Sequence, residues 1–310
     1  MNYLVTGGAG FVGSKIADKL ICQGHQVVII DNLSTGYLSN INTNATFIKG
    51  DCSDINTISK LNEFAFDAIL HIAGQSSGEV SFEDPVYDIN SNTVSTLLLL
   101  QYAVKKGCKR FIYASTMSVY GQQGDQLCFS EKDLTNPLSF YAVGKLASEA
   151  YLKIYSAIYG INYTALRYFN IYGPGQNLVN LKQGMISIYL KQLIDPSFDK
   201  ITVKGSSDRF RDFIYIDDVV SITTGFINQQ ASFNEIINIG TGKKTTVSEL
   251  LALLKQHTGI EKPVEYYAGT PGDQFGIYAD IHKLNNLYTA PLEHIERGVR
   301  LFCKNALGVK

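Results

Sequence analysis

The sequence lacks several features that mark specialised classes of protein. Its 310 residues contain no cluster of basic residues and the formal net charge is −1, so its electrostatics give no reason to expect nucleic acid or an anionic membrane as a partner. The five cysteines include no CxxC pair, which argues against a disulfide framework or a zinc site and suits a reducing compartment. We therefore expect no bound metal, and any anionic ligand must be held by local groups.

Long hydrophobic runs are also missing. The most apolar run, TLLLLQYAV at 96–104, is too short to cross a bilayer. The first residues, MNYLVTGGAG, show no basic leader with an apolar segment and a cleavage site, so we expect no secretory signal. These observations predict a cytoplasmic protein without a membrane partner. An apolar content of 45% and a charged content of 18% are ordinary for a globular chain that buries a real core.

Strand-like runs alternate with helical stretches through the first half of the chain. The runs rich in β-branched and aromatic residues lie at 3–6, 26–31, 46–50, 67–73, 110–115 and 163–169. Amphipathic or apolar helical stretches lie at 11–24, 54–64, 85–107 and 137–160. Nearly continuous apolar strands joined by helical crossovers predict an α/β fold with a doubly wound parallel sheet, the Rossmann fold, covered on both faces.

The character of the sequence changes after residue 169. The turn-rich segment NIYGPGQNLVN (170–180) opens a part whose elements are shorter and less regular. We therefore predict a Rossmann domain for the cofactor over 1–169 and a smaller lobe, mainly for the substrate, over 170–310. Two later runs, 212–220 and 236–242, are expected to return to the main sheet.

A glycine-rich turn follows the first predicted strand. In TGGAGFVGS (6–14), Gly7 permits a tight turn, Gly10 lets the backbone approach a pyrophosphate, and Gly13 lets the next helix sit close to the sheet. The amides at the start of that helix would face the phosphates. Asp31, at the end of the second strand, could bind both ribose hydroxyls and repel a 2′-phosphate, which favours NAD over NADP. The alternative is a solvent-facing aspartate at a strand end.

A tyrosine and a lysine lie four positions apart in SFYAVGKLASEA (139–150). On an α-helix Tyr141 and Lys145 share a face, so the ammonium is expected to lower the pKa of the phenol and let it exchange protons with a substrate hydroxyl. The pair alone could be an accident of a helix surface. The preceding strand, however, ends near Ser115, Thr116 and Ser118, at the sheet edge where ligands bind in open α/β folds. Ser118 is expected only to cap a turn.

With these motifs in this order, the chain resembles the extended short-chain dehydrogenases/reductases, of the nucleotide-sugar epimerase/dehydratase kind typified by UDP-galactose 4-epimerase. The resemblance runs nearly end to end. The matching motifs are TGGAGFVGS, DNLSTG (31–36), GDCSD (50–54), HIAG (71–74), Asn92, YASTMSVYG (113–121), Tyr141 with Lys145, RYFNIYGPG (167–175), RFRDFIYIDDVV (209–220), NIGTG (238–242) and PGD (271–273).

The resemblance implies NAD as the cofactor and a nucleotide sugar as the substrate. The implied NAD contacts are Gly7, Gly10, Phe11, Val12 and Gly13 at the pyrophosphate; Asp31, Asn32, Leu33, Ser34, Thr35 and Gly36 around the adenosine ribose; Asp51 and Cys52 at the adenine; and Ile72, Ala73, Gly74, Ser76, Asn92, Tyr141, Lys145 and Phe169 by the ribose and nicotinamide. The implied substrate contacts are Thr116 at the reacting oxygen, Asn170 at the diphosphate and Arg211 at the phosphates. Asn170 could instead be a turn residue, and Arg211 could form a surface ion pair with Asp208 or Asp212.

The implied reaction is oxidation at C4 of the sugar. Tyr141 would take the hydroxyl proton while hydride passes to the nicotinamide, and Thr116 would steady the oxygen as it becomes a carbonyl. A 4-epimerase then returns the hydride to the other face of the sugar. Dehydration is disfavoured, because Met117 and Ser118 stand where dehydratases have Asp-Glu. A C4 dehydrogenase or reductase remains open, as does a non-catalytic dinucleotide-binding sensor or scaffold, although such relatives usually lack the tyrosine–lysine pair.

Three positions depart from the UDP-galactose epimerase pattern. Thr270 stands where relatives commonly carry an arginine, Ser76 stands in place of a lysine, and Glu79 is either a solvated loop charge or a group near the sugar. We therefore expect another UDP-sugar or a GDP-linked hexose or heptose as the substrate. The resemblance also predicts a homodimer through the apolar helices at 85–107 and 137–160, unless these simply cover the sheet.

Overall fold

A computed structural model describes residues 1–269 and 275–309. Its contacts divide the chain into two compact units. The first comprises Met1–Val119, Ser139–Arg167 and Val220–Ile237, and the second comprises Tyr120–Leu138, Tyr168–Val219 and Asn238–Lys310. The segment 120–138 thus groups with the second unit. The assignment of residues 1–169 to the cofactor and of 170–310 mainly to the substrate concerns their roles and remains a prediction.

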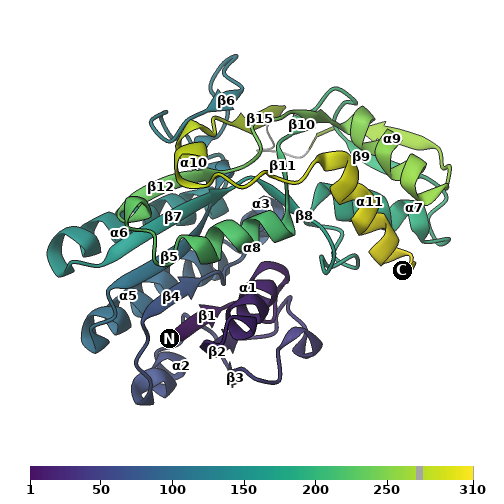
Figure 1. The fold of residues 1–310 in the computed structure, drawn as a ribbon. Coiled ribbons are helices and arrows are strands. Elements are labelled where there is room, and N and C mark those ends of the chain that lie inside the picture. Colours follow the sequence, from purple (N-terminus) through teal and green to yellow (C-terminus); the bar gives the residue numbers. More distant parts are fainter. Residues whose placement is uncertain (270–274, 310) are drawn as a thin grey trace. The chain divides into compact units, whose positions relative to one another are not determined.

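A seven-stranded sheet forms the centre of the first unit, in the order β12-β7-β5-β4-β1-β2-β3 (Figure 1). Its strands are β1 (Asn2–Thr6), β2 (Gln26–Asp31), β3 (Thr46–Lys49), β4 (Ala68–His71), β5 (Arg110–Thr116), β7 (Asn162–Tyr168) and β12 (Glu235–Ile239). Strand β1 pairs in parallel with β2 and β4, β2 with β3, and β4 with β5. The predicted Rossmann-type α/β sheet is confirmed.

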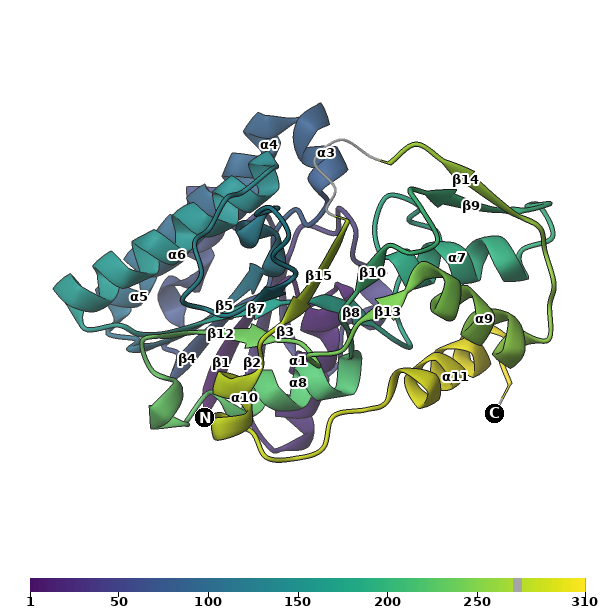
Figure 2. The ribbon, with the colours of Figure 1, turned by 90° about the horizontal axis from the view of Figure 1, so that it is seen from above.

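Helices cover both faces of this sheet. On one face α1 (Phe11–Cys22) lies beside α8 (Ile216–Gly225), where Lys19 Nζ is 2.9 Å from Ser221 Oγ (Figure 1). The other face carries α2 (Ile55–Ser59), α5 (Ser95–Lys106) and α6 (Phe140–Tyr159). Two short helices, α3 (Gly78–Glu83) and α4 (Pro85–Ile89), pack against α6 (Figure 2). The predicted helix over 85–107 is therefore interrupted, because a π-helical turn at Asn90–Val94 joins α4 to α5.

The core explains why the predicted strands are apolar on both sides. Leu4, Ile69 and Phe111 on adjacent strands pack in one cluster with Leu99 of α5 and Leu152 of α6, and all five are fully buried. Residues that alternate with them, such as Val5 and Leu70, are fully buried as well. A parallel sheet with helices on both faces leaves no face for polar residues, so the strands read as continuous hydrophobic runs.

Within the described residues, the second unit contains three smaller sheets. A four-stranded sheet has the order β13-β10-β15-β6, and two parallel pairs are β8 with β11 and β9 with β14. Their bounds are β6 (Cys128–Phe129), β8 (Asn170–Tyr172), β9 (Ile201–Lys204), β10 (Phe210–Arg211), β11 (Phe213–Tyr215), β13 (Thr245–Thr246), β14 (Val264–Tyr267) and β15 (Gly276–Ala279). Its helices are α7 (Met185–Ile194), α9 (Val247–Thr258), α10 (His282–Leu287) and α11 (Ile295–Ala306).

The prediction that two later runs return to the main sheet is half right. Residues 235–239 do so as β12, at the edge of the sheet next to β7. The run 212–220 does not, because residues 213–215 pair with β8 in a separate sheet and the chain then turns into α8. Among the described residues, no helix combines the length and the apolar character that a membrane crossing requires.

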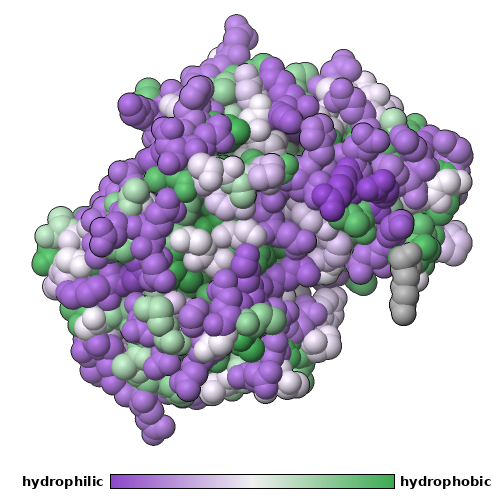
Figure 3. All heavy atoms as spheres, viewed as in Figure 1, coloured by the Kyte–Doolittle hydropathy of each residue, from purple (hydrophilic) through white to green (hydrophobic). Residues whose placement is uncertain are grey.

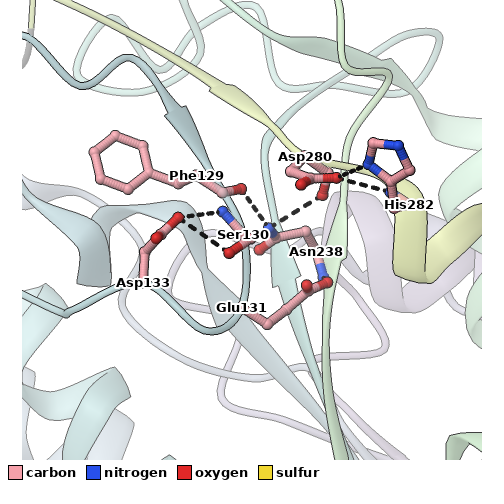
Figure 4. Close-up of polar contacts among 7 residues, drawn as sticks. All are labelled: Phe129, Ser130, Glu131, Asp133, Asn238, Asp280 and His282. Atoms are coloured by element: carbon pink, nitrogen blue, oxygen red, sulfur yellow. Dashed lines mark hydrogen bonds and ion pairs between the residues drawn. The ribbon is translucent and has the colours of Figure 1, made fainter.

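The segment 120–138 is held in the second unit by a polar network around Asn238 (Figure 4). The buried Asn238 amide nitrogen donates to the carbonyls of Phe129 and Asp280, at 2.8 and 3.4 Å. The backbone N–H of Asn238 donates to Glu131 Oε1 at 2.7 Å. Because buried backbone and amide groups must find partners, these bonds fix where the segment lies within its unit.

A buried ion pair ties α6 to the sheet. Glu149 of α6 accepts hydrogen bonds from Arg167 of β7, at 2.9 Å from Nε and 2.7 Å from Nη2, and from the Ser115 hydroxyl of β5 at 2.5 Å. The three side chains are almost fully buried. The pair thus fixes the register of α6 against the strand that ends at Thr116.

Replacing Glu149 by glutamine should destabilise the first unit strongly, because the Arg167 charge would stay buried without its carboxylate. We expect Glu149→Gln to lower the free energy of unfolding by about 3 kcal/mol, measured by urea denaturation. The control is Glu261→Gln, since Glu261 forms an exposed ion pair with Lys255 at 2.7 Å; its effect should stay within about 0.5 kcal/mol. Equal effects of the two substitutions would contradict the role given to the buried pair.

Candidate active site

The carboxyl ends of four neighbouring strands carry polar residues at one edge of the main sheet. Strands β1, β2, β4 and β5 end at Thr6, Asp31, His71 and Thr116. Because these strands are adjacent and parallel, their last residues meet at the same edge. This is the edge at which open α/β sheets bind ligands.

The glycine turn after β1 has the predicted geometry. Gly7 adopts a left-handed conformation (φ +70°), and a side chain there would also lie 2.8 Å from the backbone nitrogen of Ala73. A Cβ at Gly13 would overlap the Gly7 carbonyl, so this glycine permits α1 to pack against the turn. Helix α1 begins directly after Gly10 with no side-chain cap and no acidic residue in its first turn. The first amides, including those of Phe11 and Val12, are thus available to an anion.

The loop after β2 folds back onto the glycine turn. Asp31, which is buried, accepts hydrogen bonds from the backbone N–H of Ala9 at 3.0 Å and of Leu33 at 2.7 Å. Leu33 is held in the left-handed region (φ 62°), which is strained for a residue with a side chain. A Cβ at Gly36 would lie 2.8 Å from Ala9. Asp31 therefore organises the loop in which the ribose contacts are predicted.

The remaining predicted adenosine contacts surround this loop. Asn32, Ser34 and Thr35 are exposed. The Asn32 amide donates to Asp51 Oδ2 at 2.8 Å. Burial raises the pKa of Asp51, but hydrogen bonds from Ser53 and Asn32 outweigh it and the net pKa is lowered. Cys52 is buried, and burial raises the pKa of its thiol, which keeps it protonated.

The structure brings Tyr141, Lys145 and Thr116 together. Tyr141 and Lys145 lie on the buried face of α6, which Ser139 caps by accepting a hydrogen bond from Ala142 N–H at 3.2 Å. Thr116 at the end of β5 lies close enough to the phenol of Tyr141 to oppose the rise of its pKa. Lys145 Nζ donates to the Ala114 carbonyl of the same strand at 2.9 Å. A helix and a strand distant in sequence thus present three reactive groups at one point.

The predicted effect of Lys145 on the pKa of Tyr141 is wrong. Burial raises the pKa of Tyr141 to about 12; the neighbouring Thr116 side chain opposes this rise and the charge of Asp88 adds to it. Lys145 is not among the groups that shift it. Burial instead lowers the pKa of Lys145 to about 8, and the charge of Asp88 opposes this fall. Desolvation dominates here, because both groups are almost completely removed from water.

The segment after β4 lies beside this group. Ala73 N–H donates to the Thr6 hydroxyl at 3.1 Å, while Gly74 and Ser76 are exposed and Ile72 is half-buried. A side chain at Gly74 would lie 3.0 Å from Lys145 Nζ and 2.5 Å from Asn92 Oδ1. Asn92 is fully buried on the π-helical turn.

Two residues of this region were not predicted from the sequence. Asp88 of α4 is almost fully buried, and its Oδ1 accepts hydrogen bonds from Gln75 Nε2 at 2.8 Å and from Asn92 Nδ2 at 3.1 Å. Gln75 also donates to the Ser77 carbonyl at 2.7 Å. The available signal was an acid in a helix expected to be apolar, one helical turn before Asn92.

The predicted substrate contacts Asn170 and Arg211 belong to the second unit. Asn170 donates from its side chain to the Asp212 carbonyl at 3.1 Å. Arg211 is buried, not at the surface, and donates from Nη1 to the carbonyls of Phe210 at 2.7 Å and Phe275 at 3.2 Å. Phe169 is buried. The motif PGD and the departure at Thr270 lie outside the described residues.

The residues of the first unit fit a dinucleotide. The Oδ1 atom of Asn92 is buried and has no hydrogen-bond partner, although its amide nitrogen is satisfied. Such an atom is costly unless a donor from a ligand reaches it. It lies beside Gly74, where the absent side chain leaves room next to Lys145. The glycine turn and the open start of α1 offer the complementary place for phosphates.

Comparison with known proteins agrees with this geometry. Residues 3–240 match the model of the NAD dependent epimerase/dehydratase family. A putative UDP-glucose 4-epimerase of Methanocaldococcus jannaschii is 37% identical over 96% of this chain and 95% of its own length.

Two solved structures are similar over nearly the whole chain. A UDP-glucose 4-epimerase with UDP-glucose from Thermotoga maritima has a TM-score of 0.95 and 33% identity, with 99% of each chain covered. A UDP-glucose 4-epimerase with NAD from Thermus thermophilus has a TM-score of 0.92 and 30% identity, again with 99% of each chain covered. With a family model that covers most of its length and relatives that cover nearly all of it, the chain belongs to the NAD dependent epimerase/dehydratase family.

Proposed function

We propose that the protein is an NAD-dependent 4-epimerase of a UDP-linked hexose. The observation that carries the proposal is that Thr116 lies beside the phenol of Tyr141, with Lys145 one helical turn away on the same buried face of α6. The similarity to UDP-glucose 4-epimerases supports the reaction and the nucleotide. The substrate would be a sugar with a free C4 hydroxyl.

In the proposed reaction, Tyr141 transfers the proton, and Thr116 and Lys145 orient the sugar and the cofactor. Tyr141 exchanges a proton with the C4 hydroxyl, and Thr116 holds the same oxygen as it becomes a carbonyl. Lys145 binds the ribose next to the nicotinamide. NAD, when bound, supplies the hydride acceptor, and its positive charge favours the phenolate.

The proposed cofactor contacts are those predicted from the sequence. The glycine turn with Phe11 and Val12 would hold the pyrophosphate, Asp31 and its loop the adenosine ribose, and Asp51 with Cys52 the adenine. Asn92 Oδ1, which has no partner, would accept a hydrogen bond at the nicotinamide end. Ile72, Ala73, Gly74 and Ser76 line that end of the proposed site, with Phe169 proposed as a further contact.

Two other reactions are less well supported. Dehydration needs an acid and a base after Thr116, and this position carries Met117 and Ser118 in a 3-10 turn at Met117–Tyr120. A dehydrogenase that releases reduced cofactor is not favoured by relatives that are named epimerases.

On the substrate side, Asn170 and Arg211 are proposed to meet the diphosphate, and Ser76 and Glu79 to influence the choice of sugar.

A homodimer is proposed from the surface of α4, α5 and α6. The outer side of α6 is an apolar stripe at helical spacing, formed by exposed Val143, Ala150, Ile154 and Ile158 and half-buried Ala147. Val86 and Ile89 of α4 and Val104 of α5 are exposed as well. In Figure 3 hydrophobic residues reach the surface at the left edge, where the end of α6 lies in Figure 1. We also propose a cytoplasmic location.

A panel of nucleotide sugars tests the reaction and the substrate. UDP-glucose, UDP-galactose, UDP-N-acetylglucosamine, UDP-glucuronate and GDP-mannose are each incubated with the enzyme, and products are identified by NMR. We expect a 4-epimer of one UDP-sugar without net formation of NADH. Accumulated NADH would identify a dehydrogenase, and bound NAD without any product would identify a scaffold.

Within this assay, Tyr141→Phe should lower turnover by roughly 10²–10⁴-fold, because the proton acceptor is lost. NAD should remain bound, since only one oxygen is removed. The matched control is Tyr159→Phe, which removes the same atom from the exposed end of α6 and should leave turnover unchanged. Full turnover in Tyr141→Phe would overturn the mechanism.

The pH dependence of turnover should reveal Lys145. Its pKa in the folded protein is lowered by burial to about 8, below the usual 10.5, so the ammonium loses its proton as the pH rises through about 8. Turnover should fall over the same range, because the charged group proposed to bind the ribose is lost. The pKa of Tyr141, about 12, lies above this window. A flat profile of kcat up to about pH 10 would contradict the role of the ammonium.

A charged residue on the apolar stripe should separate the proposed dimer. We expect the wild-type protein to sediment as a dimer and Ile154→Glu to sediment as a monomer, because a carboxylate would be buried at the interface. Leu134→Glu changes a more exposed residue of the second unit and serves as the control. A wild-type protein that is monomeric at working concentration would refute the dimer.

A further inference from the structure

The buried carboxylate of Asp88 has no part in the reaction described above. It is 1% exposed, and its Oδ1 atom accepts the amides of Gln75 and Asn92. Asn92 donates from the same nitrogen to the Gln75 carbonyl at 2.9 Å. Both amides therefore point their nitrogens toward Asp88. The oxygen of Asn92 consequently faces Gly74 and Lys145.

Asp88 also lies against the helix that carries the reactive pair. A Cβ placed on Gly144 would be 3.4 Å from Asp88 Oδ2 and 3.3 Å from Asn92 Cβ, so α6 approaches the carboxylate closely at this residue. Gly144 directly precedes Lys145. The charge of Asp88 raises the pKa of Lys145, and the charge of Lys145 lowers that of Asp88, whose pKa is raised chiefly by burial.

The other groups around Lys145 do not supply this charge. His71 is buried beside it, and burial together with Lys145 lowers the pKa of His71 to about 3, so the ring is neutral. The Tyr113 ring lies 4.9 Å from Nζ, and the Ala114 carbonyl accepts its hydrogen bond. Tyr141 is a protonated phenol with a pKa of about 12. Glu149, on the next turn of α6, is paired with Arg167.

We propose that Asp88 is a positioning residue that keeps Lys145 charged and turns the Asn92 oxygen toward the cofactor side. The assignment rests on the proposed function of Lys145 and Asn92. One carboxylate oxygen orients the two amides, and the charge of the whole group offsets the loss of water around the ammonium. In this role Asp88 acts through Lys145 and Asn92.

The test is the titration of Lys145 in the full-length protein with its cofactor as purified. Lysines are labelled with ¹³C at Cε, the Lys145 resonance is assigned by its loss in Lys145→Met, and its chemical shift is followed with pH. In the wild type we expect a charged Lys145 at neutral pH. In Asp88→Asn the midpoint should fall by about one pH unit or more, because the charge is removed while an oxygen remains to accept both amides.

Asp84→Asn is the matched control. Asp84 caps the same helix by accepting a hydrogen bond from Tyr87 N–H at 2.9 Å, and asparagine caps equally well. This variant loses one negative charge a helical turn away and should leave the Lys145 midpoint unchanged. If Asp88→Asn does not fold, Asp88→Ser, which is smaller and also uncharged, replaces it with the same expected fall.

The outcomes separate this inference from the proposed reaction. A Lys145 midpoint that is unchanged in a folded Asp88 variant overturns the inference, as does a wild-type Lys145 that is already neutral at pH 7. Neither result needs turnover. If the Lys145 midpoint falls as expected in Asp88→Asn but no nucleotide sugar gives a product, the role of Asp88 stands and the proposed epimerase activity is refuted.

Discussion

An ammonium group buried at the edge of the sheet is the constraint around which the first unit is arranged. Lys145 is 3% exposed, and a lysine removed from water loses its proton unless the protein replaces the lost hydration. The replacement comes from the Ala114 carbonyl, the face of the Tyr113 ring and the charge of Asp88. Each comes from an element that must be in place before the lysine can be buried. The packing of these elements therefore also determines whether Lys145 is charged.

The π-helical turn at Asn90–Val94 helps to hold Asp88 in place. It lies between α4 and α5 and carries Asn92, whose amide reaches Asp88 on one side and the Gln75 carbonyl on the other. Turns of this kind occur mostly as single turns inside α-helices, and frequently at functional sites. Here the turn carries a side chain with an unpaired buried oxygen.

The sequence was sufficient for the parts that depend on short-range patterns. The apolar strands, the glycine turn and the spacing of Tyr141 and Lys145 predict the sheet and the faces of its helices, because periodicity and turn chemistry are local. The pKa of Tyr141 was predicted in the wrong direction, since the degree of burial depends on how α6 docks on β5. Asp88 was missed for the same reason: its neighbours Gln75 and Gly144 lie on other elements. The run 212–220 reads as a strand of the main sheet, yet its partner β8 appears only in the tertiary structure.

The route of the chain between β5 and α6 has an evolutionary consequence. After Val119 the chain leaves the first unit, contributes residues 120–138 to the second, and returns at Ser139, the cap of α6. Thr116 and Tyr141 therefore stand on either side of an excursion that is anchored elsewhere, by Asn238 and its partners. Insertions or deletions in this excursion could remodel the surface of the second unit without disturbing the hydroxyl–phenol contact, so new specificities could arise while the chemistry is inherited intact.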